Sequence, residues 1–298
     1  MRILLHNHQG KADGLERALG ERGHTFSNDD PDVILCDHDG PEYYRSVIEQ
    51  GAAHGVPTVL YSHGATSYVA WDGLWQSHPA VAKYLAISRA EKAIMQQYGY
   101  PKPIEVIGWY WSELSTPRKV TGRKVLFAPI HVLTNGFIPP QAAAANTAAY
   151  NCLLRAGVEL TVRHLGSLHT QGLWIAPEVT YQEADHHMTD RIVEGYDLVV
   201  SYGSLAYLAV ARGIATRMYA QGLAPWDGYT LETMRTAAHF EQYRTCMEYP
   251  YSVEDASGLF EFDRPEALAQ WKAEHIGNPL RPEHLESLLE QVIRDAHG

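Results

Sequence analysis

The sequence predicts an α/β protein with two doubly wound parallel sheets and a helix at its C-terminal end. Three observations support this prediction. Apolar segments of strand length alternate with segments of helical periodicity, a polar stretch interrupts this alternation near the middle, and the last residues carry one apolar stripe. Alternating strands and helices imply parallel strands joined by right-handed crossovers, so each half of the chain is expected to form one domain.

The first half contains several apolar runs, each followed by polar residues or glycine. The run "DVILCDH" is continuous rather than alternating, which is typical of a strand covered on both faces. The expected strands of this half are Arg2–His8, Asp32–His38, Thr58–Gly64, Tyr84–Ser88 and Ile104–Gly108, and the expected helices include Tyr43–Ala53 and Arg89–Tyr98.

The composition changes at Trp109–Lys124, which is polar, carries Pro117 and Gly122 and has no convincing periodicity. We therefore expect an N-terminal domain at 1–112, a linker at 113–123 and a C-terminal domain at 124–278. The second alternation predicts strands at Val125–Ile130, Leu160–Gly166, Tyr196–Gly203 and Ala215–Ala220, and helices at Gln141–Arg155 and Ser204–Gly213.

The segment 279–298 is expected to be a C-terminal helix that packs back on the protein. Pro282 suits its first turn, where the missing backbone N–H costs nothing. The apolar residues recur at helical spacing and form one stripe, which consists of Leu285, Leu288, Leu289, Val292, Ile293 and Ala296.

Composition and charge restrict the partners and the location of the chain. The formal net charge is −11 with neutral histidines, which disfavours a broad electrostatic grip on nucleic acid. No apolar run reaches the ~20 residues that a membrane span needs, and the N-terminus predicts a strand rather than a signal peptide. Cys36, Cys152 and Cys246 stand far apart without a Cys-x-x-Cys pair, so we expect a reducing, cytoplasmic location.

Two segments rich in histidine and aspartate raise the question of a metal site. "HNHQGKADG" begins with His6 and His8, and "CDHDG" contains Asp37. Together they resemble the opening of the PHP phosphoesterases, in which such residues hold a metal cluster. That family would also need a glutamate where this chain has "YSHG" and a late Asp-x-His on a strand. The late Asp295–His297 falls on the expected terminal helix, so a metal-dependent phosphoesterase stays an alternative only.

The first half also contains a series of segments in a fixed order: "GKADGLERALGERGHTF", "PDVILCDHDG", "HGVPTVLYSHG" and "YLAISRAEKAIMQQYGYPKPIEVIGW". In this order they resemble the first loop and helix, the third strand, the fourth strand and the stretch before the interdomain hinge of the GT-B glycosyltransferases. The resemblance covers most of the chain. It implies two Rossmann-like domains that face each other across a cleft, with ligands beyond the carboxyl ends of the strands.

In the second half, "VRHLG" and "VSYGSLAYLAVARGIATRMYA" are similar to the CDP-glycerol glycerophosphotransferase branch of this fold. The match is partial. Tyr202, Gly203 and Ser204 stand where that branch has Tyr-Ser-Ser, and no proline follows His164. This departure leaves the donor chemistry less defined than the fold.

The candidate donor site lies at strand ends of the second half. Ser201, Tyr202, Gly203 and Ser204 open a helix, whose unpaired amides and partial positive charge favour a diphosphate. The same four residues are also typical of a serine N-cap with a glycine turn, which would bind no ligand. Three further side chains are expected to bind donor phosphates, namely Arg163, His164 and His131.

The candidate acceptor side lies on the first half. Transfer with inversion needs a base that takes the proton of the acceptor hydroxyl. His63 is the first candidate for this base, Asp39 the second and His8 the third. Three further residues are expected on the acceptor side, namely Gly10, Gly64 and Trp71.

The resemblance therefore implies a metal-independent glycosyltransferase that uses a nucleotide-sugar as co-substrate and no resident cofactor. The alternatives on the same fold are a CDP-linked polyol-phosphate transferase and a sugar-nucleotide epimerase, and the alternative from another class is the phosphoesterase with His6, His8 and Asp37. The acceptor is not predicted: it can be a small molecule, a glycan or a modified nucleic-acid base. The negative net charge of the chain disfavours the last of these. The sugar, the anomeric outcome and the oligomeric state are not predicted.

Overall fold

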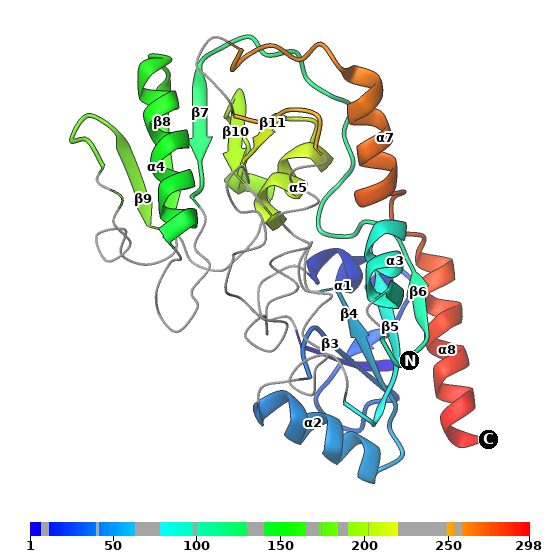
Figure 1. Cartoon of the computed structure of the whole chain (residues 1–298). Coiled ribbons are helices and arrows are strands. Elements are labelled where there is room, and N and C mark those ends of the chain that lie inside the picture. Colours follow the sequence, from blue (N-terminus) through cyan, green and yellow to red (C-terminus); the bar gives the residue numbers. More distant parts are fainter. Residues whose placement is uncertain are drawn as a thin grey trace. The chain divides into compact units, whose positions relative to one another are not determined.

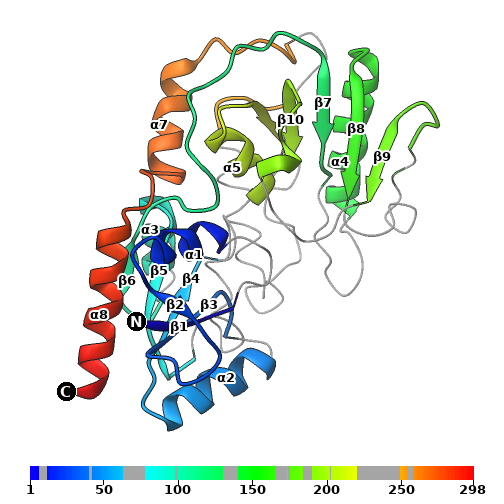
Figure 2. The ribbon, with the colours of Figure 1, turned by 180° about the vertical axis from the view of Figure 1, so that it is seen from behind.

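The computed structural model describes residues 1–6, 12–39, 42–62, 78–97, 100–129, 140–164, 173, 175–183, 190–201, 203–219, 249–253 and 258–298. These residues belong to two compact units, which Figures 1 and 2 show from opposite sides. The described part of unit 1 lies within Met1–Glu113 and Ala273–Gly298, and that of unit 2 lies within Leu114–Thr230 and His239–Lys272.

Unit 1 is built on a parallel sheet with the strand order β2-β1-β3-β4-β5-β6. Helix α2 contacts β3 and β4, whereas α3 contacts β5 and β6. Strands β3 and β4 are buried along their whole length, as their continuous apolar sequences predict. The strands are β1 Arg2–Leu5, β2 Thr25–Phe26, β3 Val33–Cys36, β4 Thr58–Tyr61, β5 Val81–Ala86 and β6 Ile104–Val106, and the helices are α1 Asp13–Gly20, α2 Glu42–Ala53, α3 Arg89–Gln97 and α8 Pro282–His297.

Unit 2 is built on a second parallel sheet, with the order β11-β10-β7-β8-β9. Helix α5 contacts β10 and β11. The strands are β7 Lys124–Phe127, β8 Glu159–His164, β9 Thr180–Glu183, β10 Leu198–Ser201 and β11 Ala215–Met218, and the helices are α4 Pro140–Arg155, a 3-10 turn at Asp190–Ile192, α5 Gly203–Ala211 and α7 Pro265–His275, whose last residues belong to unit 1.

Two parallel sheets with flanking helices confirm the predicted α/β class and its doubly wound character. Strand β9 and helix α7 were not among the predicted elements. Among the described helices, none combines the length and the apolar character that a bilayer crossing requires.

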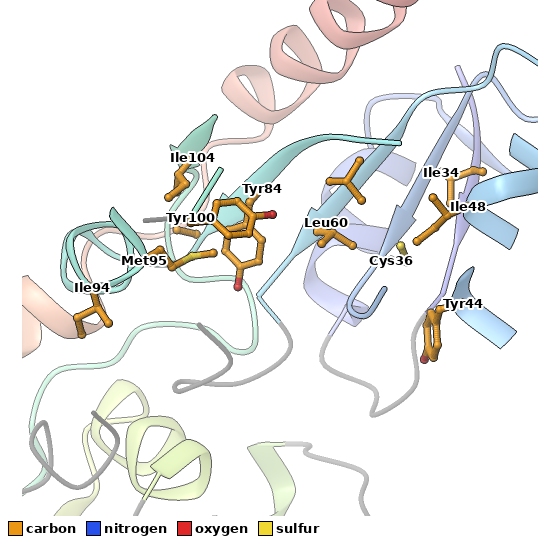
Figure 3. Packing of buried hydrophobic residues seen from close by; sticks show 12 residues of the cluster. Ile34, Cys36, Tyr44, Ile48, Leu60, Tyr84, Ile94, Met95, Tyr100 and Ile104 are labelled. Carbon is orange, nitrogen blue, oxygen red and sulfur yellow. The ribbon is translucent and has the colours of Figure 1, made fainter. Parts of the chain in front are cut away.

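One part of the core of unit 1 lies between its sheet and the helices α2 and α3. Figure 3 shows side chains from β3, β4 and β5 that meet side chains from both helices. Burial of such side chains supplies the main driving force for folding of the unit. The labelled members of this cluster are Ile34, Cys36, Tyr44, Ile48, Leu60, Tyr84, Ile94, Met95, Tyr100 and Ile104.

Helix α8 packs back on unit 1, as its apolar stripe predicts. Leu285, Leu288, Leu289 and Val292 are buried. At the rim, Arg22 forms an ion pair of 3.1 Å with Glu283 and donates from Nε to Glu286 at 2.6 Å, joining the turn after α1 to α8. The C-terminal helix is therefore a part of the first unit, although the second unit separates them in sequence.

The aromatic start of the polar segment after β6 is buried in unit 1. Trp109 is almost fully buried and its ring centroid lies 4.7 Å from that of Trp111. The Trp109 N–H donates to the Asn278 carbonyl at 2.8 Å, and the Leu280 N–H donates to the Trp109 carbonyl at 2.9 Å. The segment that follows β6 is therefore hydrogen-bonded to the segment that precedes α8.

Gly108 is required where these two segments cross. Its φ is +94°, and a Cβ atom would lie 2.6 Å from the Asn278 carbonyl oxygen. Gly55 has a φ of +73° but open space around it. We expect Gly108→Ala to destabilise the protein by about 2–4 kcal/mol and Gly55→Ala by about 1 kcal/mol, since both strain the backbone but only the first overlaps a neighbour. Urea unfolding of both variants measures the difference, and equal losses would contradict the close approach.

In unit 2, the buried Arg217 of β11 ties the returning C-terminal segment to the sheet. Its guanidinium donates to the backbone carbonyls of Leu259 at 2.8 Å, Ser252 at 2.7 Å and Glu261 at 2.6 Å, and also to that of Gly258. The same group lies 5.1 Å from the centre of the Phe262 ring. A planar group with several fixed donors is needed for this arrangement.

Arg217→Lys should therefore destabilise the protein by at least about 2 kcal/mol, because an ammonium group cannot reach all these carbonyls and leaves some of them without a donor. Arg155→Lys, at the exposed end of α4, is the matched control and should change the free energy of unfolding by less than about 0.5 kcal/mol. Thermal and urea unfolding measure both effects. A tolerated Arg217→Lys would show that the segment is held by its apolar contacts instead.

Candidate functional site

The carboxyl ends of parallel strands meet at one edge of each sheet, and ligands of open α/β sheets bind there. In unit 1 this edge is formed by β1, β3, β4 and β5, which are direct neighbours. The residues that follow these strands are His6, Asp37 to Asp39, Ser62 and Ser88. They form the carboxyl edge of unit 1.

Asp39, the second candidate for the base, lies at this edge and is 2% exposed. Its Oδ2 accepts a hydrogen bond of 2.7 Å from the His78 N–H. Burial raises the pKa of the Asp39 carboxyl, while this hydrogen bond opposes the rise. A carboxylate with a raised pKa is a stronger base than an exposed one, which suits a proton acceptor.

Asp37 lies on the same edge and is also buried, with a hydrogen bond between its side chain and the Tyr44 hydroxyl. Burial raises the pKa of Tyr44, and the nearby Asp37 raises it further. The hydroxyl of Tyr61 donates to the His6 carbonyl, which ties the end of β4 to the end of β1.

Aromatic rings surround His6 at the end of β1. Its ring centroid lies 5.5 Å from that of Tyr43 and 5.7 Å from that of Tyr44, both edge to face, and His38 lies 5.4 Å from Tyr44. Burial lowers the pKa of His6, which favours the neutral ring. The edge thus combines acidic side chains with a patch of packed aromatic rings.

The other acceptor-side predictions lie outside the described residues, namely His63, His8, Gly10, Gly64 and Trp71. Of the phosphoesterase set, His6 and Asp37 lie at the ends of the neighbouring strands β1 and β3. Within the described ranges, no three His, Cys, Asp or Glu side chains are grouped as ligands of one metal ion. The described strands form two open parallel sheets, one in each unit.

A buried glutamate that the sequence analysis did not single out completes the edge. Glu91, in the first turn of α3, is 2% exposed. Its Oε1 accepts from the Tyr84 hydroxyl at 2.8 Å and its Oε2 from the Ile87 N–H at 2.7 Å, and the Ser62 hydroxyl also donates to this carboxylate. The Glu91 N–H donates to Ser88 Oγ at 3.2 Å.

The local sequence explains why α3 begins here. Ser88 takes the N-cap position and Glu91 the third helical position, the spacing of a capping box. In this chain the glutamate reaches the N–H of Ile87, one residue before the N-cap. The "SRAE" spacing was the signal for this arrangement.

Burial raises the pKa of Glu91 to about 7, and the three hydrogen bonds only limit the rise. Folding therefore disfavours the ionised form. The contribution of Glu91 to the free energy of unfolding is therefore most favourable below pH 4.5, the ordinary pKa, where the carboxyl is protonated in both states. This contribution is lost as the pH rises to about 7. The total loss corresponds to about 3 kcal/mol.

Glu91→Gln should remove this pH dependence. Relative to the native chain, the variant should gain about 2 kcal/mol of stability between pH 5 and pH 7.5, because the amide has no proton to lose. Urea unfolding at both values measures the change, with Glu105→Gln on β6 as the control. A constant difference between variant and native chain at the two pH values would contradict the assignment.

The carboxyl edge of unit 2 is formed by β7, β8 and β10 and by the start of α5. Ser201 is buried and its Oγ donates to the Ala128 carbonyl at 3.3 Å, so the ends of β10 and β7 are joined. The Tyr219 hydroxyl lies 3.2 Å from the same carbonyl and 2.9 Å from Asn146 Oδ1 of α4. Polar groups from several elements therefore converge under this edge.

The predicted donor residues are distributed unevenly over this edge. Arg163 and His164 are consecutive on β8, so they point to opposite faces of the sheet, and only His164 is fully buried. The Ser204 side chain is partly exposed in the first turn of α5, and Gly203 is the first residue of that helix. His131 and Tyr202 lie outside the described residues.

No family model and no curated protein sequence matches the chain. Among solved structures, it is similar to the glycosyltransferase SnogD from Streptomyces nogalater, with 13% identity and a TM-score of 0.51 over 98% of this chain and 99% of that chain. It is also similar to a ugt transferase from Siraitia grosvenorii in complex with UDP, with 9% identity and a TM-score of 0.47 over 99% of this chain and 94% of that chain.

A third similarity is to a chain of the GtfA/B complex, with 16% identity and a TM-score of 0.45 over 88% of this chain. This chain spans only 57% of the length of that one. The likeness to SnogD extends over nearly all of both chains and shows the fold. The two-unit α/β architecture is GT-B-like, which confirms the two parallel-sheet domains that the sequence resemblance implies.

Proposed function

We propose that this protein is a metal-independent glycosyltransferase that moves a sugar from a nucleotide-sugar to a hydroxyl acceptor, with no resident cofactor. The observation that carries the proposal is the GT-B-like fold over nearly the whole chain, with polar and titratable groups at the carboxyl edges of both sheets. Fold alone does not fix an activity, so the residues at each edge supply the rest of the reasoning.

Unit 2 is the proposed donor side. The N-terminus of α5 carries the positive end of the helix dipole, which favours a diphosphate, and Gly203 and Ser204 occupy its first turn. Arg163 and His164 end β8 on opposite faces of the sheet, and the one that faces the donor would neutralise the leaving nucleotide. These groups would take the part that a divalent cation plays elsewhere, which is why the proposal needs no metal. His131, Ser201 and Tyr202 belong to the same proposed site.

Unit 1 is the proposed acceptor side. His63 directly follows Ser62 at the end of β4 and is the first candidate for the base, with Asp39 and His8 behind it. Burial raises the pKa of the Asp39 carboxyl, which supports Asp39 as the second candidate for the base. Gly10, Gly64 and Trp71 would contact the acceptor, for which a small molecule or a glycan suits the negative charge of the chain better than a nucleic-acid base.

A CDP-linked polyol-phosphate transferase is the second candidate. It is favoured by the "VRHLG" and "SYGS" segments, which end β8 and open α5 at the proposed donor edge. The two candidates differ in the group that leaves the nucleotide, so the choice of donor separates them.

The donor is tested by thermal shift with UDP-, GDP-, CDP- and TDP-sugars and with CDP-glycerol. We expect one nucleotide class to raise the melting temperature by several degrees without added metal. A shift with CDP-glycerol alone would select the second candidate. Stabilisation by manganese or zinc alone, with no effect of any nucleotide, would contradict both.

The base is tested by His63→Ala. With the donor found above, transfer should fall ~10²–10⁴-fold while donor affinity stays nearly unchanged, because the base acts on the acceptor. His54→Ala, at the exposed end of α2, is the control and should keep full activity. Unimpaired turnover of His63→Ala would remove this residue from the mechanism and leave Asp39 to be tested next.

A further inference from the structure

Tyr43 is a large aromatic side chain that lies exposed beside the carboxyl edge of unit 1. It belongs to the first turn of α2, which follows β3, and it is 64% exposed. The other large hydrophobic side chains that are exposed in the described part of the chain, Leu154 and Tyr181, belong to unit 2. A single exposed apolar side chain is common on protein surfaces, so its surroundings decide whether it has a task.

Two neighbouring rings hold the Tyr43 ring in place. The His6 ring centroid lies 5.5 Å from that of Tyr43, with the ring planes at 88°. The Tyr44 ring centroid lies 5.7 Å from that of Tyr43, with the planes at 79°. Edge-to-face contacts of this kind are favourable and restrict the rotation of the rings. The exposed ring is therefore ordered in advance, so a ligand that binds to it pays less conformational entropy.

The two rings that support Tyr43 contribute surface rather than charge. His6 Nε2 is buried and has no hydrogen-bond partner among the described residues, which costs free energy. Burial lowers the pKa of His6, which favours the neutral ring. Tyr44 is 8% exposed, and its hydroxyl is hydrogen-bonded to Asp37. His6, Tyr43 and Tyr44 thus form a neutral aromatic patch.

The contacts of the aromatic patch exclude several classes of ligand. Its three rings touch one another, so an ammonium group has no room between them, as it has in an aromatic cage. The buried carboxyl of Asp37, which is bonded to Tyr44, disfavours an anionic ligand.

A sugar ring is also a poor match for the aromatic patch. Its hydroxyls would need several polar partners, whereas the Tyr44 hydroxyl and Asp37 are already bonded to each other. A flat, uncharged aromatic ring needs no such partners, because it gains its binding energy by stacking on an aromatic face.

We propose that the aromatic patch binds a planar aromatic ring of a neutral acceptor, which stacks on Tyr43. The acceptor of the proposed transfer is then an aromatic alcohol, such as a phenol. That this molecule is an acceptor rests on the proposed function, whereas the binding of an aromatic ring to Tyr43 does not.

The test measures the binding of three neutral alcohols to the full chain by saturation-transfer difference NMR, without a donor. Naphthol is flat and aromatic, its fully saturated analogue has the same carbon skeleton without aromatic rings, and methyl glucoside is a sugar. We expect naphthol to bind most tightly. The proposal is overturned if naphthol does not bind, or if either of the other two alcohols binds as tightly.

Three variants locate the binding. Tyr43→Leu keeps an apolar side chain but removes the ring, so it should weaken naphthol binding ~2- to 12-fold. Tyr43→Phe keeps the ring and should bind naphthol as the native chain does. Tyr181→Leu, at the other exposed tyrosine, is the matched control and should leave the dissociation constant unchanged. Equal affinities of Tyr43→Leu and the native chain would contradict the proposal, as would equal losses in Tyr43→Leu and either other variant.

Kinetics separate this inference from the proposed function. With the donor identified by thermal shift, naphthol should accept the sugar, and Tyr43→Leu should raise the KM for naphthol while the KM for the donor stays unchanged. If naphthol binds through Tyr43 but no donor supports any transfer, the proposed function fails and the aromatic site stands. Transfer to methyl glucoside but not to naphthol would overturn the acceptor class.

Discussion

Parallel strand pairing is the constraint on which the rest of this structure depends. Every named pair of described strands is parallel, in both sheets. Residues that follow separate strands, such as His6, Asp37 and Ser62, are therefore brought to one edge despite their separation in sequence. The polar side chains of each unit are therefore brought together by the parallel pairing of the strands rather than by local sequence motifs.

Each edge carries buried polar groups, and their partners decide whether the fold tolerates them. In unit 1, Asp39 is held by the His78 N–H and Glu91 by hydroxyl and backbone donors. In unit 2, Ser201 donates to the Ala128 carbonyl at the edge. Hydrogen bonds of this kind hold the buried groups in one arrangement at the cost of desolvation, which suits a site that must hold its groups in place.

The sequence predicted the buried elements best. Strands β3, β4 and β10 are continuous apolar runs, and α8 has an unmistakable stripe. Strand β9 was missed because "TYQE" is an edge strand with polar faces, and α7 because its apolar residues form no regular stripe. Asp39 was predicted and lies at the edge. Glu91 was missed because a charged residue in a helix normally faces water, and the donors that accompany its burial come from Tyr84 of β5, from Ser62 after β4 and from Ile87 after β5.

In the proposed function, the nucleotide binds at the carboxyl edge of unit 2. Hydrogen–deuterium exchange of the full chain, with and without the stabilising nucleotide, tests it most directly. We expect slower exchange in the first turn of α5 and at the end of β8, with the strands of unit 1 unchanged. Protection confined to the edge of unit 1 around His6 and Asp37, or protection by a metal ion alone, would contradict the account.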